Sequence, residues 1–137
     1  MKLKVLVADD SKVAQIMIGE GLSDDLYSKR TAVNGQEALD IYYKWQPDIV
    51  LLDIMMPLVS GYLVLKEIRE YEKKEGTPKK TGVVMLTALS DKESITDCLR
   101  IGVQGYVVKP FKPGEIAQRV EEARTKMEAA AKPTEQK

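Results

Sequence analysis

The sequence contains no histidine, a single cysteine and no net charge. Without histidine, the chain cannot supply a Ser-His or Cys-His catalytic pair, a histidine-ligated zinc site or a phosphohistidine of its own. Lys+Arg 21 minus Asp+Glu 21 gives a formal charge of zero, so no overall basic field exists to hold nucleic acid or an anionic membrane. We therefore expect neither of these as a direct partner.

Disulfides and long apolar segments are also missing. Cys98 is the only cysteine and can form no internal disulfide, which fits a reducing compartment. The longest uncharged stretch, residues 54–65, contains a proline and a glycine and is too short to span a bilayer. The first ten residues, MKLKVLVADD, lack the small-residue cleavage site of a signal peptide. Together these features predict a cytoplasmic protein.

Short apolar runs alternate with helical patterns along the 137 residues, which is about the length of one domain. Four runs rich in β-branched residues are typical of strands buried on both faces and lie at 3–8, 49–52, 83–86 and 106–108. A weaker run at 27–33 has the polar interruptions of an edge strand. This alternation predicts an α/β sandwich whose five-stranded parallel sheet carries helices on both faces.

Terminal residues predict where several helices begin and end. Capping-box patterns at Asn34 and at Ser90 each precede an amphipathic run. Gly102 has the position of a C-cap after the second of these helices. Pro113 opens a last helix that reaches about residue 131.

Two polar segments are interpreted as surface. Residues 70–81, EYEKKEGTPKKT, are charge-dense and predict a solvated helix end and turn without core residues. Residues 132–137 are interpreted as a polar C-terminal tail, which leaves residues 1–131 as one domain.

Polar residues stand at the carboxyl ends of four predicted strands. The first strand is followed by Asp9 and Asp10, the third by Asp53, the fourth by Thr87 and the fifth by Lys109. Because an open parallel sheet binds ligands beyond the carboxyl ends of its strands, we expect these side chains to line one crevice. In the flavodoxin-like strand order 2-1-3-4-5 the first and third strands are neighbours, so the three carboxylates would crowd together.

Such crowding requires compensation, because two carboxylates about 4 Å apart repel by about 4 kcal/mol at an effective dielectric constant near 20. Mg²⁺ held by Asp9, Asp10 and Asp53 is one remedy, since oxygen-only ligands with several waters suit this ion better than Ca²⁺. Lys109 can reach the cluster with its long side chain. Proton sharing, which would raise the pKa of one carboxylate, is the alternative, and the residue pattern leaves both open.

The same set could receive a phosphoryl group. In-line transfer needs a nucleophilic oxygen, neutralised charge and fixed geometry. Asp53 is the best nucleophile because it comes from the central strand, and Lys109 would balance phosphoryl charge. Thr87 offers a hydroxyl, and the small Ala88 would leave its backbone amide approachable.

A family resemblance rests on four motifs in order: Asp9-Asp10-Ser11, Asp53-Ile54-Met55-Met56-Pro57, Thr87-Ala88 and Lys109-Pro110-Phe111. Over residues 3 to about 128 the chain resembles the receiver domain of two-component response regulators. The resemblance implies that Asp53 accepts a phosphoryl group from a phosphohistidine of a histidine kinase or histidine phosphotransfer protein. It also implies Mg²⁺ held by Asp9, Asp10, Asp53 and the backbone carbonyl of Met55.

The resemblance further implies a switch. In receivers the residue at Thr87 moves toward the phosphoryl group and the aromatic residue at Tyr106 turns inward, which changes the face made by the fourth helix, fifth strand and fifth helix. The Lys109-Pro110 peptide bond is commonly cis in the family. Because no output domain follows, the chain is similar to stand-alone receivers. We expect a regulatory phosphoacceptor, not an enzyme, that contacts a downstream protein and is a monomer or a weak phosphorylation-dependent dimer.

Two pairs of apolar residues carry further expectations. Val13 and Ile16 extend the first helix beyond its buried stripe, and in receivers this helix docks onto the donor, so we predict partner contacts there; a broad core stripe is the alternative. Met55 and Leu89 flank the phosphorylation site, and neither can orient an attacking water. We therefore hypothesise slow self-dephosphorylation.

Three other functions are weighed against this interpretation. A haloacid-dehalogenase-like phosphatase also uses an aspartate nucleophile and Mg²⁺, but its paired aspartates are separated by one residue, whereas Asp9 and Asp10 are adjacent. A flavodoxin-like FMN carrier would need a phosphate-binding loop after the first strand, where Asp-Asp-Ser would repel phosphate. A receiver that is never phosphorylated would have little use for the intact acidic set.

Overall fold

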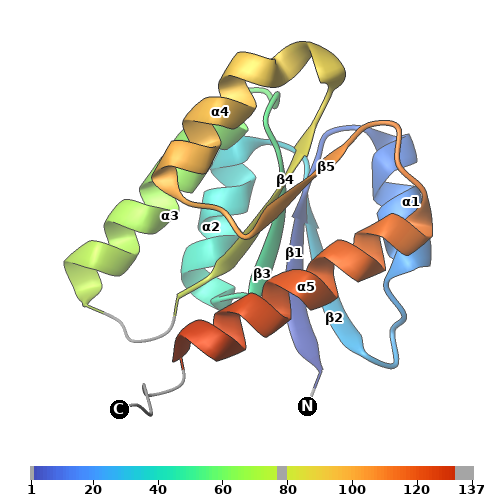
Figure 1. Cartoon of the computed structure of the whole chain (residues 1–137), viewed down its shortest axis with the longest axis horizontal. Helices are drawn as coiled ribbons and strands as arrows, with labels where there is room; N and C mark the ends of the chain where they lie inside the picture. Colours follow the sequence, from blue (N-terminus) through green and yellow to red (C-terminus); the bar gives the residue numbers. More distant parts are fainter. Residues whose placement is uncertain (1, 77–79, 132–137) are drawn as a thin grey trace.

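Strands and helices alternate along the chain, as predicted from the apolar runs (Figure 1). The computed structural model describes residues 2–76 and 80–131, so the predicted polar tail at 132–137 lies outside the described residues. The strands are β1 (Leu3–Ala8), β2 (Tyr27–Ala32), β3 (Ile49–Asp53), β4 (Gly82–Thr87) and β5 (Gly105–Val108). The helices are α1 (Lys12–Gly21), α2 (Gly35–Trp45), α3 (Gly61–Glu75), α4 (Lys92–Ile101) and α5 (Pro113–Ala131), with a 3₁₀ turn at Leu89–Asp91 before α4.

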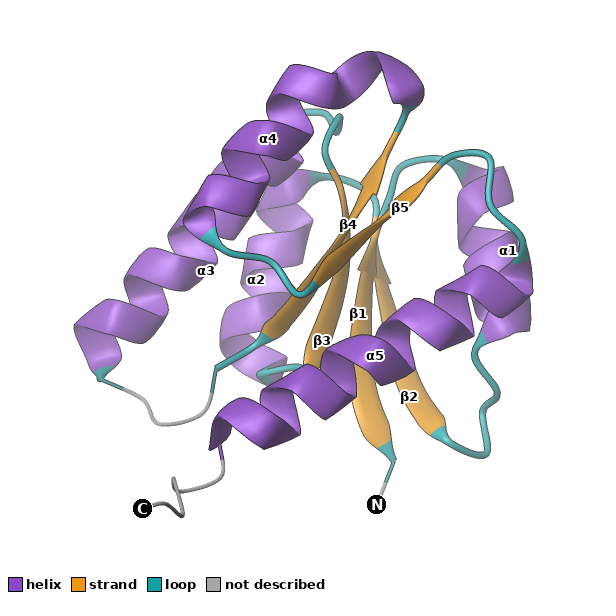
Figure 2. Cartoon of the chain, in the orientation of Figure 1, coloured by secondary structure: helices purple, strands orange, loops and turns teal. Residues whose placement is uncertain are grey.

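The five strands are parallel and follow the order β2-β1-β3-β4-β5, which confirms the flavodoxin-like sheet (Figure 2). The register pairs Ala8 of β1 with Leu52 of β3, and Asp53 of β3 with Leu86 of β4. The carboxyl ends of these strands therefore meet at one edge of the sheet. The beginning of β1 and the end of α5 lie toward the opposite edge in Figure 1.

The core has two layers because successive strand residues point to opposite faces. Val5 and Val7 of β1 pack in the layer covered by α1 and α5, whereas Leu6 and Ala8 belong to the layer covered by α2, α3 and α4. Cys98 of α4 is fully buried in the second layer, and burial raises the pKa of its thiol to about 11. None of the helices in the described ranges combines the length and the apolar character needed to cross a membrane.

The predicted helix ends are partly confirmed. The Asn34 side chain caps α2, and Gly102 closes α4 at a φ of 119°, as expected. The capping box predicted at Ser90 is wrong, because the helical turn before α4 already follows Ala88. The Asp91 carboxylate accepts a hydrogen bond from the backbone N–H of Ala88 at 3.3 Å.

The expectation of no core residues within 70–81 is also wrong. Glu72 is only 2% exposed and Thr81 is buried. The Glu72 carboxylate accepts hydrogen bonds from the Arg69 guanidinium at 2.9 Å and from the Thr81 N–H at 2.6 Å. Composition alone could not reveal this, because a buried and paired charge has the same letter as a solvated one.

Arg69, Glu72, Thr81 and Gln104 form a cluster, called the Arg69 cluster below, at the amino-terminal edge of the sheet. The Arg69 guanidinium also donates to the carbonyl oxygens of Gly102 at 3.1 Å and Thr81 at 2.8 Å, and to Gln104 Oε1 at 3.1 Å. The same Gln104 oxygen accepts the N–H of Val83 at 2.7 Å. These bonds tie α3 to the beginnings of β4 and β5.

Candidate functional site

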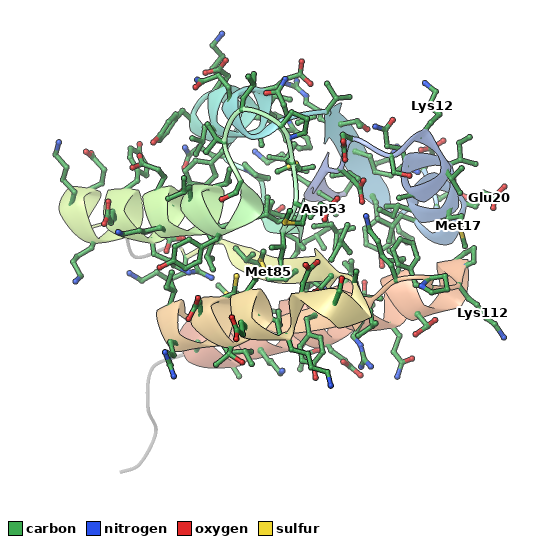
Figure 3. The ribbon with its side chains drawn as sticks, turned by 90° about the horizontal axis from the view of Figure 1, so that it is seen from above. Lys12, Met17, Glu20, Asp53, Met85 and Lys112 are labelled. Atoms are coloured by element: carbon green, nitrogen blue, oxygen red, sulfur yellow. The ribbon has the colours of Figure 1, made fainter. Side chains whose placement is uncertain are left out.

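Three carboxylates meet at the carboxyl edge of the sheet, as predicted. One oxygen from each of Asp9, Asp10 and Asp53 lies within 4.8 Å of the other two. Asp9 is fully buried, Asp53 is 5% exposed and Asp10 is exposed. Figure 3 looks onto this edge and shows Asp53 near the centre of the molecule, well inside the peripheral Lys12 and Lys112.

The loop after β3 passes very close to Asp53. Gly61, the first residue of α3, donates its N–H to the carbonyl oxygen of Ile54 at 2.8 Å. A Cβ atom at Gly61 would lie 2.0 Å from the carbonyl oxygen of Asp53, which no side chain could tolerate. Glycine at this position therefore lets α3 start directly against the strand that carries the central carboxylate.

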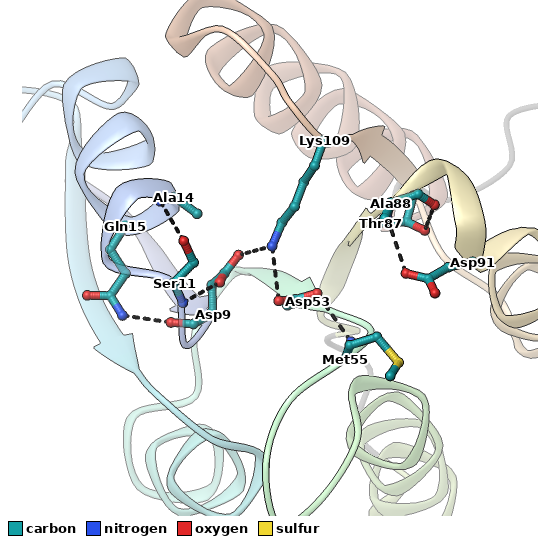
Figure 4. Close-up of polar contacts among 10 residues, drawn as sticks. All are labelled: Asp9, Ser11, Ala14, Gln15, Asp53, Met55, Thr87, Ala88, Asp91 and Lys109. Atoms are coloured by element: carbon teal, nitrogen blue, oxygen red, sulfur yellow. Dashed lines mark hydrogen bonds and ion pairs between the residues drawn. The ribbon is translucent and has the colours of Figure 1, made fainter.

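Neighbouring residues fix the orientation of the acidic side chains (Figure 4). Ser11 donates its N–H to Asp9 Oδ1 at 2.8 Å, and Gln15 of α1 donates to the Asp9 carbonyl oxygen at 2.7 Å. Met55 donates its N–H to Asp53 Oδ1 at 3.2 Å. The supporting role of Gln15 was not predicted. The two backbone bonds have a local signal, since aspartate often accepts the N–H two residues on in a turn.

Lys109 bridges two of the carboxylates, as its length suggested. Its Nζ lies 2.9 Å from Asp9 Oδ2 and 3.0 Å from Asp53 Oδ2, and it donates a hydrogen bond to the latter. The cluster of Asp9, Asp10, Asp53 and Lys109, called the carboxylate cluster below, carries three acidic groups and one ammonium. With all groups ionised it therefore has a net charge of −2.

Burial, followed by the negative charge of Asp9, raises the pKa of Asp53 to about 6, although the Lys109 contact acts in the opposite direction. Burial alone would lower the pKa of Lys109, but its contacts with Asp9 and Asp53 outweigh that effect and raise it. The raised pKa of Asp53 is the response expected of a crowded acid without a cation. The excess negative charge is equally what a divalent ion would offset.

The donor set fits Mg²⁺. Asp9 Oδ2 is buried, and it shares the Lys109 ammonium, 2.9 Å away, with Asp53. One shared ammonium does not neutralise two carboxylates that are both largely buried. One oxygen from each of Asp9, Asp10 and Asp53 supplies the hard ligands that Mg²⁺ prefers.

The carboxyl end of β4 differs from the prediction in one respect. Thr87 is buried, and its hydroxyl donates to the carbonyl oxygen of Ala88 at 3.1 Å. The Ala88 amide, expected to be approachable, is instead bonded to Asp91. On the neighbouring strand Tyr106 is 45% exposed. The Lys109-Pro110 peptide bond is cis, as the resemblance implied.

Three of the apolar residues predicted around the site, Val13, Ile16 and Met55, lie on the surface. Val13 is 68% and Ile16 is 55% exposed, so both residues lie outside the core. The alternative of a broad core stripe on α1 is therefore excluded. Met55 is exposed as well. The side chain of Leu89 lies outside the described part of the structure.

The family model described as response regulator receiver domain matches residues 5–121. The chain belongs to this family. It is therefore the receiver domain of a response regulator in two-component signalling. Membership implies a kinase or phosphotransfer protein as a partner, and receiver domains generally bind Mg²⁺ at an acidic pocket such as the carboxylate cluster.

Relatives with different overall lengths match this receiver domain. The chain is 41% identical over 119 residues to "Probable transcriptional regulator ycf27" of Guillardia theta, covering 87% of this chain and 44% of that protein. It is 32% identical over 118 residues to "Protein CcdB" of Bacillus subtilis, covering 85% and 93%. The chemotaxis response regulator CheY4 of Vibrio cholerae aligns with a TM-score of 0.78 and 29% identity over 90% of this chain and 99% of that one. The chain thus spans about half the length of the ycf27 relatives.

Proposed function

We propose that the protein is a phosphorylation-driven switch in which Asp53 accepts a phosphoryl group from a phosphohistidine donor in the presence of Mg²⁺. The observation that carries the proposal is the carboxylate cluster, where Asp53 lies against two other acids and shares the Lys109 ammonium with Asp9. The protein acts as a regulatory phosphoacceptor and does not turn over a separate substrate.

The transfer requires one nucleophilic oxygen and no redox partner. An oxygen of the Asp53 carboxylate attacks the phosphorus, a P–O bond forms and the P–N bond of the donor breaks. The electron pair of the broken bond stays on the donor imidazole, which leaves as a neutral ring when its other nitrogen carries a proton. Asp53 supplies the nucleophile because the chain has no histidine of its own.

The remaining residues hold the phosphoryl group and the metal. Asp9, Asp10, Asp53 and the backbone carbonyl of Met55 would ligate Mg²⁺. When bound, the ion supplies positive charge that offsets the negative charge of the transferring group. The Lys109 ammonium, which lies against both Asp9 and Asp53, would balance phosphoryl charge, and the hydroxyl of Thr87 and the amide of Ala88 would donate hydrogen bonds to the phosphoryl oxygens.

Acetyl phosphate provides a direct test. Incubation of the full chain with acetyl phosphate and Mg²⁺ is expected to add one phosphoryl group, which peptide mapping should locate at Asp53. The Asp53→Asn variant should lose the label, whereas Asp97→Asn, which changes an exposed acid on α4, should keep it. No label, or a label on another residue, would refute the proposal. Release of phosphate from a generic phosphate ester would favour the phosphatase alternative.

The donor is proposed to dock on the exposed residues Val13 and Ile16 of α1, the helix that follows Asp9 and Asp10 in the chain. Val13→Glu or Ile16→Glu should slow phosphotransfer from the cognate donor about tenfold, equal to about 1.4 kcal/mol of binding or transition-state energy. Labelling by acetyl phosphate should be unchanged because this small donor needs no docking surface. Leu26→Glu, at an exposed site outside α1, is the matched control. Unimpaired transfer from the cognate donor would contradict this role.

The aspartyl phosphate is proposed to be long-lived, because Met55 and Leu89 cannot orient an attacking water. A measured lifetime of only seconds would contradict this. We place the switch in the cytoplasm, in keeping with the single reduced cysteine, and propose that its output is a contact with a downstream protein. The phosphorylated form is expected to be a monomer or a weak dimer, which sedimentation can determine.

A further inference from the structure

Both hydrogen-bond donors at the carboxyl end of β4 are bonded locally and do not point to Asp53. The Thr87 hydroxyl donates to the Ala88 carbonyl oxygen at 3.1 Å, and the Ala88 N–H donates to Asp91 Oδ2 at 3.3 Å (Figure 4). A phosphoryl group on Asp53 would therefore meet donors that already have acceptors. The acceptor of the Ala88 amide is an anion, as a phosphoryl group is.

Local backbone geometry explains why Asp91 reaches this amide. Ala88 is extended, with φ −91° and ψ 159°, and directly precedes the helical turn at Leu89–Asp91. An acid at the third position of a helical turn can reach back to the N–H of the capping residue, as in a capping box. Ala88 has no side-chain acceptor to complete that box. Asp91 thus provides this half of the cap alone.

We propose that Asp91 is a positioning residue that occupies the Ala88 amide in the unphosphorylated protein and is displaced when Asp53 is phosphorylated. The inference rests on the proposed function, in which the amide of Ala88 binds a phosphoryl oxygen. One N–H cannot serve two acceptors fully, and the two anions repel each other. Asp91 therefore stabilises the unphosphorylated state, and phosphorylation removes the cap from the turn that leads into α4.

The packing of α4 allows this turn to respond. Among the described side chains of α4, Cys98 alone is buried, whereas α3 buries five residues. Ile95 and Ile101 pack against the same core layer but stay partly exposed. The helix α4 is therefore less deeply buried than α3, and less packing opposes a shift of its beginning when the cap is lost. The Asp91 bond thus connects occupancy of the site to the position of a weakly anchored helix.

Beryllium fluoride, which forms an analogue of an aspartyl phosphate, tests the inference with the full chain and saturating Mg²⁺. Asp91→Ala is expected to bind the analogue about fivefold more tightly than the wild type, which equals about 1 kcal/mol at 1.4 kcal/mol per tenfold. Asp91→Asn keeps the shape without the charge and should lie between the two. Glu93→Ala removes an exposed acid two residues further on and should match the wild type, because the acceptor of the Ala88 N–H is Asp91.

Hydrogen exchange supplies a readout that helix stability alone would not produce. The Ala88 amide should exchange about fivefold faster in Asp91→Ala than in the wild type without the analogue, and equally slowly in both with the analogue bound. Equal analogue affinity of Asp91→Ala and the wild type, or an equal gain in Glu93→Ala, would overturn the inference. If the wild type itself neither binds the analogue nor is labelled at Asp53, the proposed function fails instead.

Discussion

Two clusters of buried charge lie at opposite edges of the same sheet and differ in how completely their charges are compensated. In the Arg69 cluster, one guanidinium faces one carboxylate, and both Glu72 oxygens accept hydrogen bonds. In the carboxylate cluster, three acids face one ammonium, which Asp9 and Asp53 share. Burial of charge is common to both. Uncompensated charge distinguishes the cluster that can take up a cation and a phosphoryl group from the one that only holds the fold together.

The largest expected effect comes from removing the carboxylate of the Arg69 cluster, in which the charges compensate each other. Glu72→Ala should lower the free energy of unfolding by about 3 kcal/mol, because it leaves the Thr81 N–H without its acceptor and the largely buried Arg69 guanidinium without its counter-charge. Urea denaturation measures this loss. Glu72→Gln, which keeps the shape and one carbonyl acceptor, should lose less. A loss below about 1 kcal/mol for Glu72→Ala would show that the cluster is not structural.

In the carboxylate cluster, removing an acid is expected to stabilise the protein instead of destabilising it. The pKa of Asp53 is raised from 3.8 to about 6, so its contribution to stability is fully present below pH 3.8 and is lost as the pH rises through about 6. At neutral pH without Mg²⁺, Asp53→Asn should therefore raise the free energy of unfolding by up to about 3 kcal/mol. The gain should vanish in acid and shrink when Mg²⁺ is added. Urea denaturation of the wild type, Asp53→Asn and the control Asp97→Asn across this pH range measures the gain. Destabilisation by Asp53→Asn at neutral pH would contradict the view that the carboxylate cluster carries uncompensated charge.

Magnesium binding should follow the same titration. A proton on Asp53 competes with the metal, so Mg²⁺ affinity should fall about tenfold per pH unit below about pH 6 and level off above it. Calorimetric titrations at several pH values measure this dependence. The Asp53→Asn variant should bind Mg²⁺ more weakly and lose most of the pH dependence. An affinity that is constant from acid to neutral pH would mean that Asp53 is not a ligand.

The smallest effect is expected where charge is paired but exposed. Arg119 and Glu122 of α5 form an ion pair at 2.9 Å on the surface. Arg119→Ala should change the free energy of unfolding by no more than about 0.5 kcal/mol, because water screens such a pair. Comparing the urea denaturation of Arg119→Ala with that of Glu72→Ala separates the effect of burial from that of ion pairing. If Arg119→Ala lowered the free energy of unfolding as much as Glu72→Ala does, burial would not be what makes the Arg69 cluster stabilising.

Much of the fold and of the carboxylate cluster could be predicted because both follow from rules that act along the chain. β-branched runs identified β1, β3, β4 and β5, and parallel strands necessarily bring the residues after their carboxyl ends to one edge. That is why Asp9, Asp53 and Lys109, far apart in sequence, were expected to meet. The order of the strands came from the family resemblance and not from the periodicity.

What could not be predicted depends on tertiary partners. The burial of Glu72 depends on Arg69 one helical turn earlier and on Thr81 nine positions later, and nothing in a charged segment indicates that these residues face inward. The start of the α4 region was misplaced because Ser90 is a good capping residue, whereas Ala88 is not, and the cap comes from Asp91 instead. The unequal exposure of the adjacent Asp9 and Asp10 was likewise settled only by the fold.

The buried thiol of Cys98 makes the motion of α4 observable without any engineered probe. Alkylating reagents attack thiolates, and at mildly alkaline pH burial keeps the thiol of Cys98 almost entirely protonated, because it raises the pKa to about 11. With its sulfur enclosed, the chain should react only during brief openings of the helix. The rate of alkylation then reports how often α4 opens locally.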